Sequence, residues 1–239
     1  VVVMEASTGK ILAMVSKPTF NPNSVGVNWE ALNNDGNSPL YNRATLGQYA
    51  PGSTFKIVTA LEYMRENENY KEYNHVCNGS TSQDGTTISC YNNRVHGEES
   101  LEDAFANSCN TSFSEIGLGL DYSGWKKTAS DLLFGEELPC DLSYNTSKFQ
   151  LKEESDTAEV MMTAMGQGDT LVSPYHMALI TSAIANGGTL MKPYLVEQIT
   201  NYTGSTVKKY MPEKHTELMT SSEAAVLSKY MTSVIDYGT

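Results

Sequence analysis

The chain has 239 residues, of which 40% are hydrophobic and 18% are charged. This balance excludes a largely disordered chain and supports one large domain or two closely packed subdomains. The formal net charge of −12 and the pI of about 4.7 argue against nucleic acid or an anionic membrane surface as the main partner. No apolar run reaches the roughly 18 residues of a membrane helix, and no segment has the pattern of a signal peptide.

The first forty residues predict a hairpin followed by a loop. Two short apolar runs, 1–7 and 10–16, flank a Thr-Gly turn and predict two antiparallel strands. The segment 18–39 is rich in Asn, Pro and Gly, which favours a loop with one short helical turn at 29–32.

The stretch from Tyr49 to Met64, YAPGSTFKIVTALEYM, places a Pro-Gly break directly before an apolar helical pattern. Ser53 stands at the predicted helix start and Lys56 follows three positions later, so the two side chains lie on one face of the helix. A buried, neutral lysine amine can take the serine proton, and the free N–H groups of the first turn can face an oxyanion. The Ser-x-x-Lys spacing has other copies without this context, at Ser7/Lys10, Ser123/Lys126 and Ser205/Lys208.

The region from Cys77 to His96 predicts short strands with turns at its Asp-Gly and Asn-Asn pairs. Four cysteines are too few for a disulfide scaffold, but Cys77 and Cys90 bracket a polar turn and are compatible with a hairpin disulfide. A zinc site made of His75, Cys77, Cys90 and His96 is an alternative whose spacing fits no common zinc finger. We therefore predict no metal and no cofactor.

A second polar pair follows a short predicted helix. Ser100, with Asp103 three positions later, has the pattern of a capping box. The tripeptide Ser108-Cys109-Asn110 then lies between this helix and the next apolar segment. A turn between two helices can project the Ser108 hydroxyl and the Asn110 amide in the same direction, although a helix cap is the simpler interpretation of this spacing alone.

The rest of the chain predicts helices, an irregular stretch and two strands. The helical segments are 121–135, with Trp125, Ala129, Leu132 and Leu133 facing inward, 156–165, which is rich in methionine, 173–188, and a last helix capped by Ser221 or Ser222 and ending near Asp236. The irregular stretch is 138–155, and the strands are 194–200 and 206–211.

The motifs together resemble the penicillin-binding protein family of serine D,D-transpeptidases, whose signature is Ser-x-x-Lys, Ser-x-Asn and Lys-Thr-Gly. The resemblance covers nearly the whole chain in the family's order, through VVVMEASTGKILAMVSKPTFNPN, NRATLGQYAPGSTFKIVTA, HGEESLEDAFANSCNTSF and MGQGDTLVSPYHMALITSAIANGGTLMKPYLV. It implies an α/β (α+β) fold of the penicillin-binding protein and β-lactamase type, with an antiparallel sheet flanked by helices. The sheet-side subdomain would comprise residues 1–52 and about 187–239, and the helical subdomain about 53–186.

The resemblance also implies an activity, that of a class B enzyme that cross-links peptidoglycan. Ser53 would attack the bond between two terminal D-alanines of a stem peptide, Lys56 would take its proton, Ser108 would relay a proton to the leaving amine, and Asn110 would hold the acyl amide. The amine of a second stem peptide would resolve the acyl-enzyme, and β-lactams would trap the same serine. The implied location is the extracytoplasmic face of the bacterial membrane, attached by an N-terminal helix that precedes this chain. Glycosyltransferases and cell-wall assembly proteins are the implied partners.

The chain departs from the family's pattern in one respect, because it contains no Lys-Thr-Gly. We expect it to be a fragment that lacks the strand with this motif, to have an exposed sheet edge, and to show weak or no activity by itself. Two alternatives use the same fold. A serine β-lactamase would need a base for deacylation, for which Glu153, Glu154 and Glu159 are candidates, and a non-catalytic β-lactam sensor or scaffold would need none.

Overall fold

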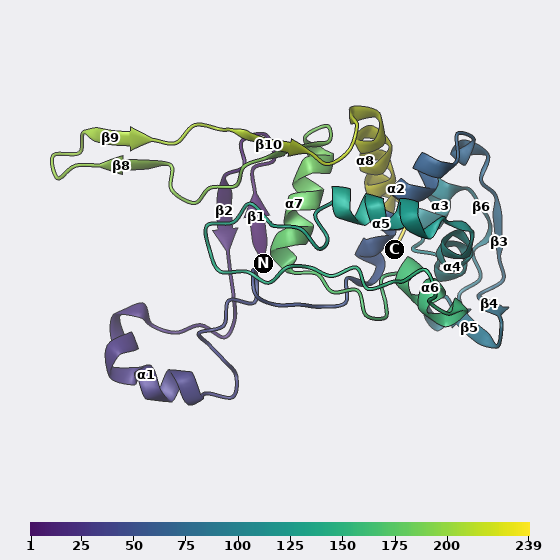
Figure 1. The fold of residues 1–239 in the computed structure, drawn as a ribbon, viewed down its shortest axis with the longest axis horizontal. Helices are drawn as coiled ribbons and strands as arrows, with labels where there is room; N and C mark the ends of the chain where they lie inside the picture. Colours follow the sequence, from purple (N-terminus) through teal and green to yellow (C-terminus); the bar gives the residue numbers. More distant parts are fainter.

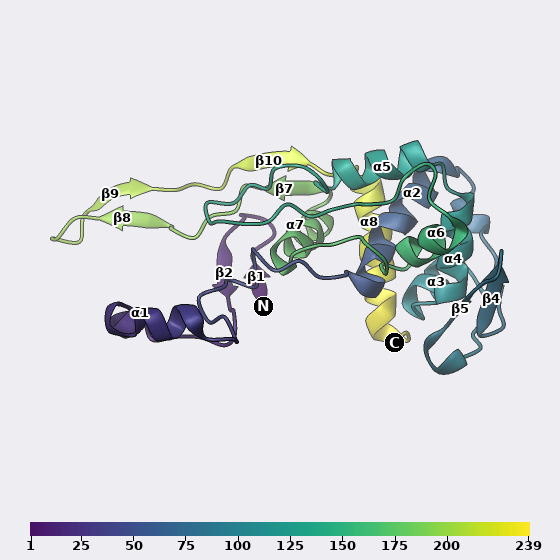
Figure 2. The same ribbon diagram turned by 60° about the horizontal axis from the view of Figure 1, so that its bottom comes forward.

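The computed structural model describes all residues, 1–239, as a helical part and an extended part that meet at one central helix (Figure 1). Helices α2 to α6 and α8 gather at one end. Helix α7 lies between them and the first hairpin, while β8–β9 and α1 project from the opposite end in both ribbon views (Figure 2). The helices are α1 (Val25–Asn34), α2 (Lys56–Glu66), α3 (Leu101–Ala106), α4 (Asn110–Gly119), α5 (Tyr122–Asp131), α6 (Thr157–Ala164), α7 (Pro174–Ala185) and α8 (Ser221–Asp236).

The strands form five separate two-stranded antiparallel sheets. The pairs are β1 with β2, β3 with β6, β4 with β5, β7 with β10, and β8 with β9. Helix α7 contacts both β1 and β7, so two of these sheets share one supporting helix. The strands are β1 (Val2–Met4), β2 (Ile11–Met14), β3 (His75–Cys77), β4 (Ser80–Gln83), β5 (Thr86–Ser89), β6 (Gly97–Glu99), β7 (Thr189–Met191), β8 (Gln198–Thr200), β9 (Thr206–Lys209) and β10 (Lys214–Glu217).

The core of the helical part is built around Phe55, which is fully buried just before α2 begins. Its ring makes an edge contact with Phe134 at 5.6 Å between centroids and stacks on Phe149 at 6.0 Å. Trp125 of α5 packs against both Phe55 and Phe149. Aromatic pairs of this geometry add about 0.5–1.5 kcal/mol each beyond the area that they bury. The turn that carries Ser53 is therefore fixed directly to the aromatic core.

Most predicted elements are confirmed, including the mixed α/β class, the first hairpin, the helix after Ser53, the capping box at Ser100 and the last helix. Some boundaries were wrong. Residues 25–34 form a ten-residue helix rather than one turn. The cap of α8 is Thr220, because its hydroxyl accepts a hydrogen bond from the Glu223 N–H. Leu133 is only partly buried, in a left-handed turn with φ of 72°.

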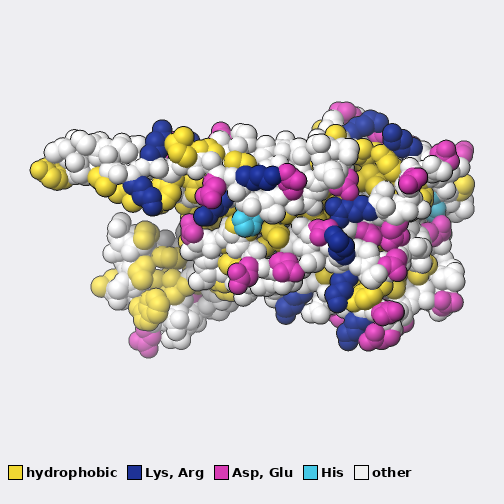
Figure 3. Space-filling model, turned by 45° about the horizontal axis from the view of Figure 1, so that its top comes forward, with side chains coloured by type: hydrophobic (Ala, Val, Ile, Leu, Met, Phe, Trp, Pro, Cys, Tyr) yellow, Lys and Arg dark blue, Asp and Glu magenta, His cyan; other side chains and the backbone are white.

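The surface differs between the two parts. Hydrophobic side chains gather at the lower left of the face in Figure 3, on the side where Figure 1 places α1, and Val27 and Trp29 of that helix are exposed. Charged side chains of both signs cover the helical part in the same view. None of the helices combines the length and the apolar character that crossing a membrane requires.

Candidate active site

Ser53 lies in a short 3-10 turn, Gly52–Phe55, that leads directly into α2. Gly52 has φ of 58°, a backbone conformation that favours glycine, and it lets the chain turn sharply at Pro51 before the helix begins. The Ser53 side chain is exposed at this turn, whereas Phe55 points into the core. The Pro-Gly sequence thus presents the Ser53 hydroxyl at the surface from a turn that Phe55 fixes to the core.

Lys56, the first residue of α2, is only 1% exposed. Its Nζ lies 3.4 Å from Ser53 Oγ, 2.9 Å from Ser108 Oγ and 2.7 Å from the Ser108 carbonyl oxygen. It also lies 2.8 Å from Asn110 Oδ1 and 5.4 Å from the centroid of the Phe113 ring. The predicted residues Ser53, Lys56, Ser108 and Asn110 therefore meet at a single amine.

Ser108 and Asn110 come from the junction between α3 and α4. Ser108 has φ of 53°, so the chain reverses there and its hydroxyl points back toward Ser53, with 2.8 Å between the two Oγ atoms. Asn110 is the first residue of α4, and its Nδ2 donates to the Ser89 carbonyl oxygen at 3.0 Å. That bond fixes the amide so that Oδ1 faces the lysine. Sequence reasoning identified Asn110 but could not identify Ser89, which acts through its backbone and leaves no residue-type signal.

The partners of Lys56 suit a group that gains and loses a proton. Two of them, the Ser108 carbonyl and Asn110 Oδ1, can only accept hydrogen bonds, so they use two N–H groups whether the amine is charged or neutral. The remaining position on Nζ faces the Ser53 and Ser108 hydroxyls. A hydroxyl there accepts the third N–H of an ammonium, or donates a hydrogen bond to the lone pair of a neutral amine. Both protonation states are satisfied without any rearrangement of heavy atoms.

The electrostatic setting makes the neutral amine more accessible than in a solvent-exposed lysine. Burial lowers the pKa of Lys56 to about 8, and the nearby charge of Glu99 opposes this shift only partly. No carboxylate forms a salt bridge with Lys56 or a hydrogen bond with its Nζ. A lysine with this pKa has a substantial neutral fraction near neutral pH and can act as a general base.

The Ser53 turn is braced by the loop that follows α6. The Gly52 N–H donates to the Gly166 carbonyl at 2.8 Å. Gly166 has φ of 79°, and a Cβ added there would lie 1.8 Å from the Gly52 carbonyl oxygen. Only glycine permits this approach. Gly166 directly follows the predicted helical segment 156–165 in the sequence, but its contact with the Ser53 turn depends on tertiary packing.

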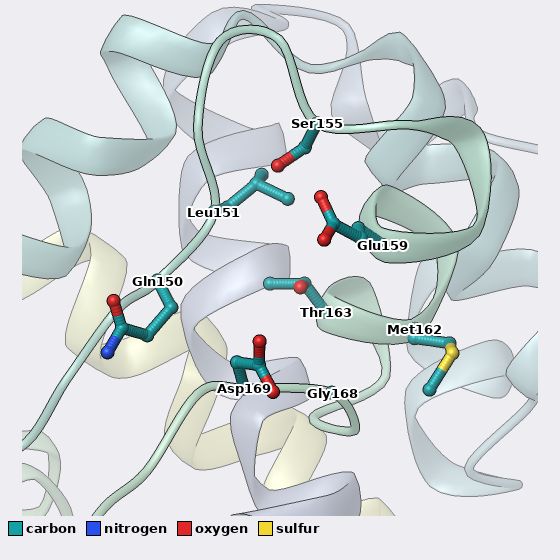
Figure 4. Close-up of a pocket in the computed structure, with 8 residues that line it drawn as sticks. All are labelled: Gln150, Leu151, Ser155, Glu159, Met162, Thr163, Gly168 and Asp169. Carbon is teal, nitrogen blue, oxygen red and sulfur yellow. The ribbon is translucent and has the colours of Figure 1, made fainter.

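A separate cavity of about 210 Å³ lies beside α6 (Figure 4). Glu159 and Asp169 both line it, together with Thr163, and Ser53 and Lys56 do not. Glu159, one of the three glutamates considered as a deacylating base, makes no hydrogen bond to Ser53 or Lys56. The candidate active site is therefore the cluster around Lys56.

Comparisons with known proteins identify relatives of the whole chain. The chain is 33% identical over 244 residues to the peptidoglycan D,D-transpeptidase PbpA of Mycolicibacterium smegmatis, an alignment that covers 97% of this chain and 49% of that protein. It is 31% identical over 242 residues to the stage V sporulation protein D of Bacillus subtilis, covering 100% of this chain and 36% of that protein. The chain thus spans about half or less of the length of these relatives.

A solved structure of penicillin-binding protein A from M. tuberculosis, an imipenem acyl-enzyme complex, superposes with a TM-score of 0.86 at 28% identity. The superposition covers 98% of this chain and 56% of that one. A family model described as "Penicillin binding protein transpeptidase domain" matches residues 1–239. The chain therefore belongs to the family of penicillin-binding protein transpeptidase domains.

Proposed function

We propose that the protein is a serine D,D-transpeptidase that cross-links peptidoglycan stem peptides. The observation that carries this proposal is the contact of one buried amine, Lys56, with two serine hydroxyls and the Asn110 amide. Two relatives support the substrate class, since PbpA is named as a peptidoglycan D,D-transpeptidase and penicillin-binding protein A was solved as an acyl-enzyme.

In the proposed first step, Ser53 Oγ attacks the carbonyl carbon between the two terminal D-alanines of a donor peptide. Its proton moves to the neutral Lys56 amine as the C–O bond forms, and the Ser53 N–H is one donor to the oxyanion. The C–N bond then breaks, and Ser108, which lies between Ser53 and Lys56, passes a proton to the departing D-alanine amine. The product is a serine ester, with Asn110 holding the amide of the acyl group.

The second step reverses the proton path. The amine of a neighbouring stem peptide attacks the ester carbonyl and loses a proton through Ser108 to Lys56. The new amide bond forms and the Ser53 oxygen leaves, recovering its proton. Because the same four groups serve both steps, no further base is required for transfer to an amine.

The proposal extends to inhibitors, location and partners. A β-lactam would acylate Ser53 by opening its ring, and the acyl group would persist because the side-chain partners of Ser53 are Lys56 and Ser108 and include no carboxylate to activate a water. We place the domain on the extracytoplasmic side of the bacterial membrane, attached by a segment outside these residues. Its expected partners are glycosyltransferases and other cell-wall assembly proteins.

Intact-mass spectrometry after incubation with benzylpenicillin tests the proposal on the full-length gene product. We expect one covalent penicillin per molecule, persisting for many minutes, and none in Ser53→Ala. Ser123→Ala is the matched control, because Ser123 and Lys126 repeat the Ser-x-x-Lys spacing on the exposed start of α5. This variant should label like the unchanged protein.

Three outcomes would change the conclusion. Labelling that survives in Ser53→Ala would remove the nucleophile assignment. A label that forms and disappears within seconds, with free penicilloate accumulating, would indicate a β-lactamase. A full-length protein that never labels would indicate a sensor or scaffold without acyl-transfer activity.

A further inference from the structure

Three cysteines and one histidine from four separate segments meet behind the second motif. Cys77 ends β3, Cys90 follows β5, His96 precedes β6, and Cys109 is the residue before α4. The three cysteines are buried, and the side chain of His96 is only 5% exposed. One ligand atom from each of the four lies within 4.8 Å of the others.

The sulfur separations fit a metal site better than a disulfide. The Sγ atoms of Cys77 and Cys90 are 3.7 Å apart, as are those of Cys90 and Cys109, and all four cysteines of the chain are free thiols. A disulfide bond would need about 2.05 Å, so the disulfide considered for Cys77 and Cys90 is wrong for this structure. Two thiolates bound to one tetrahedral zinc at about 2.3 Å lie about 3.8 Å from each other, close to the observed spacing.

The groups around the cluster are arranged as a supporting shell. The Gly79 N–H donates to Cys77 Sγ at 3.4 Å, and Thr111 Oγ1 lies 3.2 Å from Cys109 Sγ. His96 Nδ1 and Glu99 Oε2 are both buried without a hydrogen-bond partner, 3.7 Å apart. An unpartnered buried imidazole nitrogen beside three thiols is unfavourable unless a ligand satisfies it.

We propose that Cys77, Cys90, His96 and Cys109 bind one structural Zn²⁺ ion. Three sulfur ligands and one imidazole form a closed tetrahedral set, which soft thiolates make selective for zinc. On binding, the three thiols release their protons to solvent and each sulfur donates an electron pair to the metal.

This ligand set differs from the one considered from the sequence, which was His75, Cys77, Cys90 and His96. His75 is not a member, because its Nε2 is hydrogen-bonded to Thr111 Oγ1 at 2.9 Å and its Nδ1 lies 3.2 Å from Glu115 Oε2. Cys109, 19 residues after Cys90, takes the place that His75 had in that set. The chain Glu115–His75–Thr111 instead supports Cys109 from behind.

The ion would stabilise two features of the chain that lie next to it. The β4–β5 hairpin has one buried residue, Ile88, and a two-stranded hairpin is marginally stable by itself. Cys109 lies between Ser108 and Asn110, so a metal bond to its sulfur fixes the turn that aims both side chains at Lys56. This second consequence rests on the proposed transpeptidase function, whereas metal binding does not.

The zinc content of the full-length protein, purified without chelators and gel-filtered, tests the proposal by elemental mass spectrometry. We expect about one zinc per chain, bound at least about tenfold more weakly in Cys90→Ser and in His96→Gln. Cys140→Ser and His215→Gln are matched controls outside the cluster and its supporting residues, and they should keep the metal. If all four variants keep zinc equally, or if the unchanged protein holds none after zinc is added back, the proposal is wrong.

Cobalt replacement provides a readout that does not require any variant to fold. The unchanged protein loaded with Co²⁺ should show thiolate-to-cobalt charge-transfer absorption and the ligand-field bands of a tetrahedral site. Octahedral bands, or a disulfide between Cys77 and Cys90 detected by non-reducing mass spectrometry, would overturn the assignment.

The penicillin label separates the two proposals. Ser53→Ala should hold zinc as fully as the unchanged protein although it cannot be acylated, and chelation should slow labelling at Ser53 by at least about tenfold. Zinc without any labelling would reject the transpeptidase and leave the metal site standing. Labelling in a protein that never binds zinc would reject the metal site and leave the transpeptidase proposal standing.

Discussion

Helix α2 carries two largely buried cations with opposite surroundings, Lys56 at its first turn and Arg65 at its last. The hydrogen-bond partners of Lys56 Nζ are all neutral oxygens. Arg65 donates to Glu223 at 2.8 Å and to Asp131 at 3.1 Å. Burial lowers the pKa of Lys56 to about 8. Burial also acts to lower the pKa of Arg65, but the hydrogen bond and charge of Glu223 override it and raise that pKa.

The difference shows how one helix separates chemistry from stability. A buried cation with carboxylate partners stays charged and ties elements together, as Arg65 does for α2, α5 and α8. A buried amine without a carboxylate gives up its proton more readily and can serve as a base. The comparison predicts that changes at Lys56 alter acylation and that changes at Arg65 alter folding.

Removing the amine should have the largest effect. In Lys56→Ala, the second-order rate of benzylpenicillin labelling at Ser53 should fall by about 10²–10⁴-fold, or roughly 3–5 kcal/mol, because the serine loses its base. The melting temperature should also fall, because the Ser108 carbonyl and Asn110 Oδ1 lose their hydrogen-bond donor, so the labelling rate is measured on the folded fraction. Lys126→Ala, in the exposed second copy of the motif, is the control for both measurements. An unchanged labelling rate in Lys56→Ala would show that another group is the base.

Removing the structural cation should have the second largest effect. Arg65→Met leaves Glu223 and Asp131 without their partner, and the free energy of unfolding should fall by about 3 kcal/mol in urea titrations. The folded fraction should label at the unchanged rate. Lys127→Met is the matched control, because Lys127 pairs with the same Asp131 but its side chain is 73% exposed. That change should cost less than about 0.5 kcal/mol. Equal losses in the two variants would contradict the comparison.

Giving Lys56 a carboxylate partner should keep it charged, as the carboxylates around Arg65 do for that side chain. In Asn110→Asp, a negative charge replaces the amide oxygen 2.8 Å from Nζ and raises the pKa of Lys56. Labelling at pH 7 should slow by about 10–100-fold, equivalent to roughly 1.4–3 kcal/mol, and part of this loss should be recovered at higher pH. Asn110→Ala removes the amide without adding a charge, so it should slow labelling without moving the pH profile upward. The same profile in both variants would argue against Lys56 as the titrating base.

The pH dependence of the unchanged protein gives the smallest effect. Because the neutral amine is the reactive form and its pKa is about 8, the labelling rate should rise about tenfold per pH unit below that value and level off above it. A reaction that needs the ammonium form would instead slow as the pH rises through this value. A rate that is constant from pH 6 to pH 9 would mean that proton transfer to Lys56 does not limit acylation.

Several parts of the molecule followed from the sequence because their causes are local. Ser53 and Lys56 face the same way because residues three apart in a helix do so, and Pro51-Gly52 mark where that helix begins. Ser108 and Asn110 were placed at a junction between helices by the capping box at Ser100. The first hairpin was predicted from the Thr-Gly turn between its two apolar runs. Helix α1 was predicted too short because its composition favours loops, and the boundaries of β8 and β9 were set too wide.

The tertiary structure alone decided which local elements meet. Lys56 and Asn110 are separated by 54 residues, and Arg65 and Glu223 by 158. Cys109 joins Cys77 and Cys90 although no spacing rule connects them. Such contacts depend on how helices pack around the aromatic core at Phe55, and periodicity in the sequence carries no information on that packing. Thus the sequence determined the chemical groups and their local geometry, whereas long-range packing determined that they form one proton-transfer cluster with a cysteine-histidine cluster behind it.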